Sequence, residues 1–459
     1  MRTRPPLRSS VGIDDLAAYI PELYLPIGEL AAERGIDPDK LRLGLGLERM
    51  ALPDQDEDAA TMAANAVRTL MERNGLAPGN VGRIYLGTES ALDGAKPTAT
   101  YVLEMLRGVY REAHGPACFD RCDVIDMTFA CVGGVDALLN TADWVRSGEG
   151  RVGIVVASDF AKYELGSTGE YTQGAGAVAM LVRDNPKLLT LQPGVGVATR
   201  GVHDFFKPGR ADTPTFDGPY SNDMYQARVR DAYAHYVELV DQPADEQPLF
   251  TWSRIVMHLP YAAHGRRMLT ELFVAELARQ GIWGEVAEAS RLGPQPHAQD
   301  FDTEADYLAA QRAYLKAVGK SSAYKDFVSQ QLAGGARASS AVGNVYAASV
   351  FLSLMSTLAH AEEHAQQLAG KTIGVLSYGS GSKSKVFSCA LRGTWDVRVR
   401  RWKLFEGLER RHAVDYDTYL KLHRGELDAP VRAPKQRFAL ERISDAPNKE
   451  GARYYRWVA

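Results

Sequence analysis

Residues 124–135 read Val124-Ile125-Asp126-Met127-Thr128-Phe129-Ala130-Cys131-Val132-Gly133-Gly134-Val135 and join a predicted buried strand to a predicted helix over residues 136–147. A cysteine at such a turn sits at a helix N-terminus, where unpaired N–H groups and the helix dipole favour the thiolate and can stabilise an oxyanion. The segment therefore predicts an α/β sheet that carries a nucleophile. A lone cysteine at a strand–helix junction is more often a buried, inert residue, so other segments must support this interpretation.

The composition is that of a soluble globular protein. The chain has 459 residues, of which 45% are hydrophobic and 24% are charged, and its formal net charge is −4. These values indicate neither disorder nor a nucleic-acid partner. Four cysteines argue against a disulfide scaffold and for a reducing compartment. No secretory signal and no membrane-spanning apolar run are recognisable, so we expect a cytoplasmic protein that does not associate with membranes.

Two further predicted strands end in candidate catalytic residues. A strand over 81–86 leads into Gly87-Thr88-Glu89-Ser90, and a strand over 255–257 leads into His258-Leu259-Pro260-Tyr261. The carboxyl ends of strands are where α/β sheets usually place their chemistry. In each half of the chain, such a strand is followed by a glycine turn that opens a helix and then by an apolar strand. In the second half these are residues 343–344, a helix over 345–368 and a strand over 372–376, so the sequence predicts a duplicated βαβ architecture.

A cysteine, a glutamate, a histidine and an asparagine at one site suit carbon–carbon bond formation on a thioester. A thiolate attacks thioesters and leaves again. A carboxylate in a dry pocket has a raised pKa and can remove a weakly acidic proton from an acyl methyl group. Histidine and asparagine can donate hydrogen bonds to the carbonyl of a second substrate, while backbone N–H groups near Cys131 and Gly379 can hold an oxyanion.

In these features the chain resembles the hydroxymethylglutaryl-CoA synthases of the thiolase superfamily. The resemblance covers nearly the whole chain, from about residue 12 onward. It rests on Gly87-Thr88-Glu89-Ser90, Phe129-Ala130-Cys131-Val132-Gly133-Gly134, Gly174-Ala175-Gly176-Ala177-Val178-Ala179-Met180-Leu181, Asp204-Phe205-Phe206-Lys207-Pro208, His258-Leu259-Pro260-Tyr261, Gly343-Asn344-Val345-Tyr346 and Ser377-Tyr378-Gly379-Ser380-Gly381. It implies a layered αβαβα thiolase-type fold built from two related halves, with no metal and no bound cofactor besides CoA thioester substrates.

The chain is accordingly expected to divide into four parts. Residues 1–197 form an N-terminal thiolase-like half with Glu89 and Cys131, and residues 252–395 form a C-terminal half with His258 and Asn344. Residues 198–251 are an excursion that borders the pocket. Residues 396–459 form an extension packed on the body. That extension is rich in basic and aromatic residues, a combination found in RNA-binding segments, but we interpret it as a packing surface.

By the resemblance, Cys131 carries an acetyl group, Glu89 is the general acid/base that forms the acetyl enolate, and His258 anchors acetoacetyl-CoA. Water then releases 3-hydroxy-3-methylglutaryl-CoA, a product of the mevalonate pathway, and a homodimer is expected. The remaining substrate-binding residues that the resemblance implies are Asn344, Ser377, Tyr346, Asp204, Thr172 and Gly379.

Two positions depart from many family members. A lysine near the CoA phosphates is replaced by Ala263, so Arg266 and Arg267 become candidates for phosphate contact, with ordinary solvated cations as the alternative. The tyrosine that often follows the catalytic cysteine is replaced by Val132, which implies a different pocket shape.

Alternative functions stay open. A related synthase of polyketide β-branching would act on a β-ketoacyl chain held by an acyl carrier protein, and a basic surface beside the pocket mouth would distinguish it. A non-catalytic scaffold or binding subunit of the same fold is opposed by the intact Cys131, Glu89 and His258. The segment His360-Ala361-Glu362-Glu363-His364 fits a zinc pattern, but histidines in the last turn of a helix are favoured by its dipole, and we predict no metal there.

Overall fold

The computed structural model describes residues 10–148, 150–209, 211–240 and 247–459. Its main sheet has nine strands in the order β11-β12-β13-β8-β1-β7-β6-β4-β5. Their bounds are β1 (Val11–Tyr19), β4 (Val81–Gly87), β5 (Asp123–Met127), β6 (Val152–Ala161), β7 (Gly174–Asp184), β8 (Leu189–Thr199), β11 (Arg254–Met257), β12 (Thr372–Gly379) and β13 (Lys383–Leu391).

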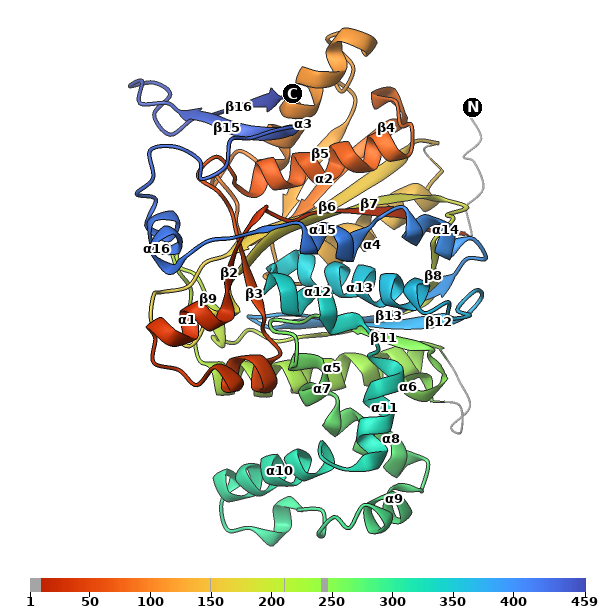
Figure 1. Cartoon of the computed structure of the whole chain (residues 1–459). Helices are drawn as coiled ribbons and strands as arrows, with labels where there is room; N and C mark the ends of the chain where they lie inside the picture. Colours follow the sequence, from red (N-terminus) through yellow and green to blue (C-terminus); the bar gives the residue numbers. More distant parts are fainter. Residues whose placement is uncertain (1–9, 149, 210, 241–246) are drawn as a thin grey trace.

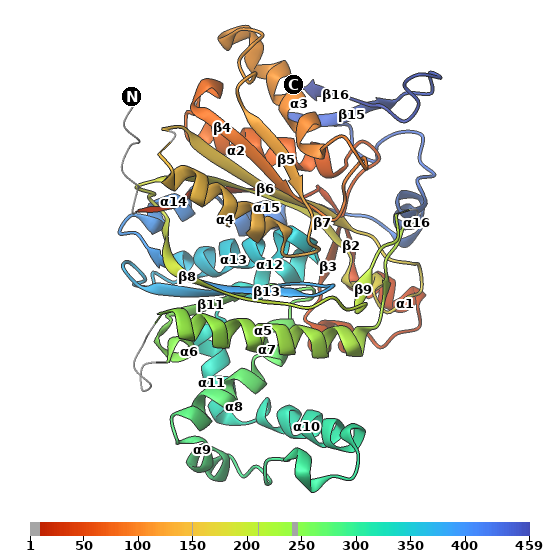
Figure 2. The same ribbon diagram turned by 180° about the vertical axis from the view of Figure 1, so that it is seen from behind.

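The sheet forms two layers with helices between and outside them. β1 and β8 are joined by the two residue pairs Gly12–Thr190 and Ile13–Leu189, and the strands on either side of this junction belong to different layers. Helices α4 (Gly133–Arg146), α12 (Gly335–Val342) and α13 (Ser349–Glu363) lie between the layers (Figure 1). Helices α2 (Ala59–Arg73) and α3 (Thr98–His114) cover one outer face, and α5 (Gly218–Val240) covers the other, as Figure 2 also shows. This is the predicted αβαβα order.

Local sequence explains the main elements. α2 begins with a capping box, in which the Asp58 carboxylate accepts from the Thr61 backbone N–H (2.9 Å) and the Thr61 hydroxyl accepts from the Asp58 N–H (2.8 Å). β7 is buried from Gly174 to Val182 because helices cover both faces of its layer, so it is apolar throughout rather than alternating.

Three details differ from the sequence predictions. β5 is an edge strand with partly exposed side chains, Ile125 being 43% exposed, rather than a buried strand. The helix after the cysteine begins at Gly133, three residues earlier than predicted. Residues 345–368 are not one helix. The Asn344 side-chain oxygen accepts hydrogen bonds from the Tyr346 N–H (2.9 Å) and the Ser349 hydroxyl (3.0 Å), and this local bonding separates a 3₁₀ turn from α13.

Smaller elements surround this core. Helices α8 to α11 form a projection beyond the layer that contains β11, β12 and β13 (Figure 1). A separate three-stranded sheet has the strand order β14-β2-β3. These and the remaining elements are β2 (Leu23–Pro26), α1 (Ile27–Glu33), β3 (Arg49–Leu52), β9 (Phe205–Phe206), β10 (Thr215–Phe216), α6 (Pro248–Thr251), α7 (His264–Met268), α8 (Thr270–Arg279), α9 (Trp283–Ala289), α10 (Glu304–Val318), α11 (Ser322–Gln331), α14 (Trp395–Arg400), α15 (Leu404–Glu409), β14 (His412–Ala413), α16 (Tyr416–Arg424), β15 (Arg437–Ile443) and β16 (Arg453–Val458). No helix among the described residues is both long and apolar enough to span a membrane.

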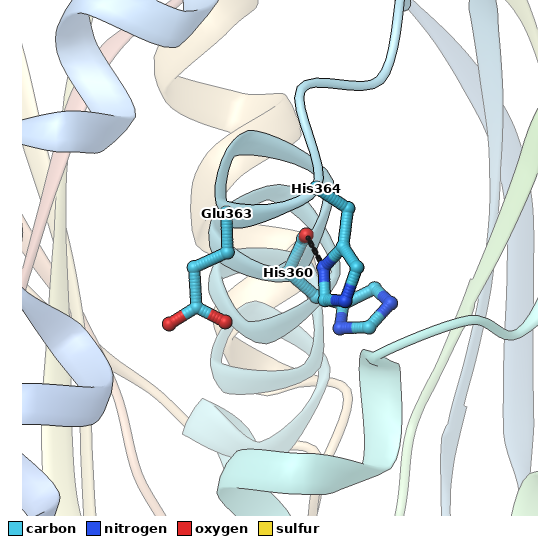
Figure 3. A group of neighbouring side chains, drawn as sticks. All are labelled: His360, Glu363 and His364. Carbon is cyan, nitrogen blue, oxygen red and sulfur yellow. Dashed lines mark hydrogen bonds between the residues drawn. The ribbon is translucent and has the colours of Figure 1, made fainter.

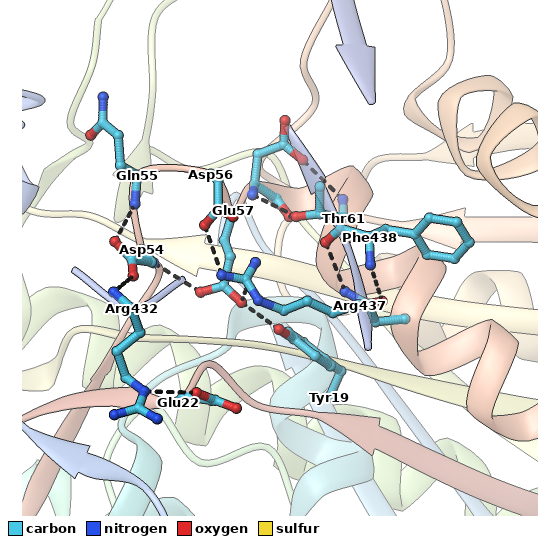
Figure 4. Close-up of polar contacts among 12 residues, drawn as sticks. Tyr19, Glu22, Asp54, Gln55, Asp56, Glu57, Thr61, Arg432, Arg437 and Phe438 are labelled. Carbon is cyan, nitrogen blue, oxygen red and sulfur yellow. Dashed lines mark hydrogen bonds and ion pairs between the residues drawn. The ribbon is translucent and has the colours of Figure 1, made fainter. Parts of the chain in front are cut away.

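The C-terminal hairpin of β15 and β16 lies on α2 and α3, and polar contacts tie it to the N-terminal half (Figure 4). Phe438 exchanges two hydrogen bonds with the Asn65 side chain, at 2.8 and 3.3 Å. Arg437 pairs with Asp56 at 2.8 Å and with Glu57 at 3.6 Å, and the Tyr19 hydroxyl donates to Glu57. The hairpin therefore closes over a buried charge network.

Candidate active site

The turn that carries Cys131 is held by both halves of the chain. Cys131 is 7% exposed, and Ala130 before it has a φ of +40°, which is strained for a residue other than glycine. Gly379, at the end of β12, packs against this turn. A Cβ at Gly379 would lie 2.7 Å from the Phe129 carbonyl oxygen and 2.8 Å from the Val132 nitrogen, so glycine is required for the close approach.

Glu89 contacts Cys131 directly. The thiol donates to Glu89 Oε1 at 2.9 Å. Burial and the charge of Asp159 raise the pKa of Glu89 to about 8, while burial and the neighbouring Glu89 raise the pKa of Cys131 above its ordinary value. The prediction that the helix dipole favours a thiolate is therefore corrected: burial beside a carboxylate outweighs the dipole, and the resting group is a thiol hydrogen-bonded to Glu89.

Asp159 supports Glu89 and was not recognised as a site residue in the sequence. It ends the apolar run of β6 and is fully buried. One carboxylate oxygen accepts from the Glu89 N–H (2.7 Å) and from the hydroxyls of Thr88 (3.0 Å) and Ser90 (2.9 Å), and the other accepts from the Ala347 N–H (2.9 Å). Burial raises its pKa to about 6. The sequence does contain a signal for Asp159, because it is a polar residue at the end of an apolar strand segment, like Glu89 and His258.

His258 follows β11 and is 1% exposed. Its carbonyl oxygen accepts from the Tyr225 hydroxyl at 2.9 Å, and the two rings are stacked at a centroid distance of 6.4 Å. Burial lowers the pKa of His258 to about 3, so the imidazole is neutral at physiological pH. It can therefore polarise a carbonyl only as a neutral hydrogen-bond donor.

Asn344 enters the site on a turn that only glycine can make. Gly343 has a φ of +91°, and a Cβ there would lie 1.9 Å from the Gln173 carbonyl oxygen. The Asn344 N–H donates to the Thr172 carbonyl at 2.9 Å. Because the Asn344 side-chain oxygen already accepts two hydrogen bonds, its amide NH₂ is the group left to donate to a ligand.

These residues meet in a cavity of about 370 Å³. Cys131, His258, Asn344, Thr172 and Tyr346 all line it. In its aromatic wall, Tyr346, which has a φ of +39°, contacts the rings of Tyr163 and Phe205, and the Phe216 ring contacts both of these. The ring centroids lie 5.4–6.4 Å apart, and the sequence did not single out Tyr163, Phe205 and Phe216 individually. The cavity is thus a largely apolar chamber with a few converging polar groups.

Glu89 lines a smaller hollow of about 230 Å³, which Tyr346 also lines, and reaches the cavity through its contact with Cys131. The predicted residues outside the cavity lining are Glu89, Asp204, Ser377, Arg266 and Gly379. The Ser377 hydroxyl donates to the Lys385 carbonyl at 2.8 Å. The Asp204 carboxylate accepts from the Tyr378 hydroxyl (2.6 Å) and the Gly381 N–H (2.7 Å). Both are fully buried, so they brace the loop after β12.

A larger hollow of about 1010 Å³ adjoins the cavity, and both are lined by Pro219, Asn222 and Arg267. Asp223, which lies 3.7 Å from Arg312, is the single acidic residue among the described residues that line it. The guanidinium groups of Arg266 and Arg267 donate to the carbonyls of Leu43 (3.0 Å) and Gly44 (2.7 Å), so each has N–H groups in use and others left. We call this hollow the basic groove, after its six cations: Arg266, Arg267, Arg312, Lys316, Lys320 and Lys325.

The zinc-like pattern forms a cluster at the C-terminal end of α13 (Figure 3), whereas Asn344 precedes the start of that helix. Candidate ligand atoms of His360, Glu363 and His364 lie within 4.8 Å of one another. The Glu363 carboxylate is paired with Arg337 at 2.5 Å, and a ring nitrogen of His364 lies 2.8 Å from the His360 carbonyl oxygen. A metal ion would have to compete with that arginine. The absence of a metal stays a prediction.

The family models for the N-terminal and C-terminal parts of hydroxymethylglutaryl-coenzyme A synthase match residues 7–187 and 196–424. The chain belongs to the hydroxymethylglutaryl-CoA synthase family. The synthase of Haloferax volcanii is 34% identical over 90% of this chain and 91% of its own length. The human cytoplasmic synthase is 31% identical over 82% of this chain and 71% of its own.

Solved structures confirm the predicted thiolase-type fold of this hydroxymethylglutaryl-CoA synthase family member. The structure of MvaS in complex with 3-hydroxy-3-methylglutaryl coenzyme A superimposes with a TM-score of 0.80 at 31% identity, covering 99% of this chain and 100% of that one. The curacin-pathway HMG synthase in complex with acetyl donor-ACP gives a TM-score of 0.77 at 22% identity, covering 98% of this chain and 100% of that one, and this similarity concerns the fold alone.

Proposed function

We propose that the chain condenses acetyl-CoA with acetoacetyl-CoA through an acetyl-Cys131 intermediate, giving 3-hydroxy-3-methylglutaryl-CoA and CoA. The observation that carries this proposal is the buried contact of Glu89 with Cys131, which lines one cavity together with His258 and Asn344. Relatives that are 31–34% identical over most of the chain bear the name of this enzyme, and MvaS was solved with the product of this reaction.

The acylation step uses the hydrogen bond that is already present. The Glu89 carboxylate takes the thiol proton as Cys131 Sγ attacks the acetyl carbonyl, and the C–S bond to CoA then breaks. The leaving thiolate receives the proton and departs as CoA. Backbone N–H groups at the Cys131 turn and at Gly379, which packs against that turn, would stabilise the oxyanion.

The condensation step uses Glu89 again. It removes a proton from the acetyl methyl group, and the resulting enolate attacks the 3-keto carbon of acetoacetyl-CoA. His258 and the Asn344 amide donate hydrogen bonds to that ketone oxygen, which becomes a hydroxyl once it is protonated. Water then hydrolyses the Cys131 thioester, which forms the free carboxylate of the product and restores the Cys131 thiol. Aromatic walls around Tyr346 limit water access before that step.

Other predicted residues take positioning roles in this proposal. Thr172 holds the Asn344 backbone, while Asp204 and Ser377 brace the end of β12 and the loop after it. The basic groove would receive the phosphates of CoA, with Arg267 at the junction of groove and cavity. This extends the predicted roles of Arg266 and Arg267 to the other four cations.

An acyl carrier protein remains the alternative partner, because the basic groove would also attract an acidic protein surface. We favour free CoA because the relatives at 31–34% identity are named for the CoA reaction, whereas the ACP-bound synthase is 22% identical. A cytoplasmic location accords with the human relative's name, and a place in the mevalonate pathway follows from the proposed reaction. We also propose a homodimer, which would pair the half-exposed edge strand β5 with its counterpart.

The test follows acetoacetyl-CoA consumption with free acetyl-CoA for the wild type, Cys131→Ala, Glu89→Ala and, as a control, the exposed His412→Ala. We expect a robust wild-type rate, no rate for the first two variants and an unchanged rate for the control. Mass spectrometry should detect an acetyl adduct on wild-type Cys131. A negligible wild-type rate together with an adduct would identify an acceptor other than acetoacetyl-CoA. No adduct would support a non-catalytic subunit.

A further inference from the structure

His264 is a buried histidine whose two ring nitrogens both lack a hydrogen-bond partner among the described residues. It begins α7, six residues after His258, and is 2% exposed. A neutral imidazole has one donor and one acceptor, and leaving both unpaired away from water costs free energy. Because His264 lines the cavity that contains Cys131, the missing partner is best supplied by what the cavity binds.

Aromatic neighbours hold the His264 ring in place. The Tyr225 ring lies edge-on to it at a centroid distance of 4.5 Å, and the Tyr261 ring lies edge-on at 4.8 Å. The Tyr225 hydroxyl is already used by the His258 carbonyl. Burial, together with the neighbouring His258 and Arg267, lowers the pKa of His264 far below its ordinary value. The ring is therefore an uncharged donor and acceptor with a fixed orientation.

The position of His264 along the proposed substrate path limits which part of a CoA ester can contact it. His258 and Arg267 are both neighbours of His264, and Arg267 borders both the cavity and the basic groove. A CoA ester with its thioester at Cys131 and its phosphates among the cations must run its pantetheine arm between these two places. That arm carries two amides, and each offers the N–H and C=O that a neutral imidazole can pair with.

We propose that His264 binds the pantetheine arm of the CoA thioester through a hydrogen bond to one of its amides. This rests on the proposed function, because it uses the same path for the substrate. His264 then sets the affinity for the thioester and takes no part in bond making at Cys131. A neutral imidazole suits an amide partner, whereas the phosphates of CoA would be bound by the arginines and lysines of the basic groove.

The test compares acetoacetyl esters of CoA, of pantetheine and of ethanethiol, all at saturating acetyl-CoA. For His264→Leu we expect KM to rise about tenfold with the first two esters, as for the loss of one neutral hydrogen bond. KM for the ethanethiol ester, which has no amide, should not change, and kcat should be kept. His264→Asn keeps a donor and an acceptor and should recover part of the affinity. The exposed His412→Leu is the control.

An equal rise in KM for all three esters, a loss of kcat or an unchanged KM would overturn the proposal. His264→Phe keeps an aromatic ring and removes both nitrogens, so it gives the same comparison if the leucine variant does not fold. Calorimetric binding of CoA and of pantetheine to wild-type and His264→Phe protein separates this proposal from the function. If the wild-type protein makes no product but binds pantetheine about tenfold more tightly than the variant, the proposed condensation reaction is refuted. The same result would support the proposal that His264 binds the pantetheine arm.

Discussion

The protonation of Glu89 governs both proposed proton transfers. A base works in its ionised form, and burial beside Asp159 raises the pKa of Glu89 to about 8. The Cys131 thiol lowers that pKa through its hydrogen bond, and acetylation removes this proton donor. We therefore predict that kcat falls as the pH decreases, with a midpoint at or above about pH 8, when measured across pH 6–10.

Asp159→Asn should move that midpoint to lower pH, because it removes the negative charge that disfavours ionised Glu89. It should also lower stability, since Asp159 accepts hydrogen bonds on both oxygens. Asp143→Asn, at an exposed carboxylate on α4, is the matched control and should leave the profile unchanged. A midpoint that stays in place in Asp159→Asn would contradict the electrostatic explanation.

The end of β12 positions the nucleophile through a contact between backbones. A Cβ at Gly379 would press on the Phe129 carbonyl and the Val132 nitrogen, so Gly379→Ala must move the Cys131 turn. We predict a loss of about 1–3 kcal/mol in the free energy of unfolding. We also predict a decrease of about 100-fold in the rate of Cys131 acetylation, because small displacements of reacting groups are costly. Mass spectrometry on a time course measures that rate.

Gly393→Ala is the control for this contact, since a Cβ there would meet nothing within 4 Å and its φ is not in the left-handed region. Its stability should stay within about 0.5 kcal/mol of the wild type, with normal acetylation. Equal behaviour of the two variants would argue against a tight fit at Gly379.

The C-terminal hairpin covers a carboxylate that should make stability depend on pH. Burial raises the pKa of Glu57 from 4.5 to about 7. Between these two pH values, the Glu57 carboxyl is protonated in the folded protein but ionised in the unfolded chain. The contribution of protonated Glu57 to the free energy of unfolding is therefore full below about pH 4.5 and is lost as the pH rises through about 7. The difference corresponds to about 3 kcal/mol.

We therefore predict that the free energy of unfolding, measured with urea, falls by about 3 kcal/mol less in Glu57→Gln than in the wild type when the pH rises from 4 to 8. The exposed Glu409→Gln is its control. A variant that follows the wild-type slope would mean that Glu57 stays ionised beside Arg437.

Strand-end polar residues made much of this site predictable. Glu89, Cys131 and His258 each follow a strand, and their one-dimensional order was enough to indicate the fold and the chemistry. The same rule would have indicated Asp159. Tyr163 and His264 could not be found this way, because their roles depend on which rings and cavity walls meet in three dimensions. The thiolate prediction was wrong because burial, which outweighs the helix dipole here, is not visible in the sequence.

The exposed edge of the sheet bears on the assembly of the whole molecule. β5 and β11 are the two edge strands of the nine-stranded sheet. β11 is largely buried, whereas β5 presents Ile125 with 43% of its surface exposed. A half-apolar edge strand without cover invites pairing with another chain. Because β5 leads directly into the Cys131 turn, such pairing would also steady the nucleophile.

We predict a dimer of about twice 50.3 kDa by light scattering at micromolar concentration. Ile125→Lys should convert it to a monomer, because the ammonium group would lose its hydration in the paired edge. Acetylation of Cys131 should slow in the same variant. Val397→Lys, at a comparably exposed position on α14, should stay dimeric. A monomeric wild type would refute the homodimer. If Ile125→Lys remains dimeric, the interface does not include β5, and dimerisation does not steady the Cys131 turn through this strand.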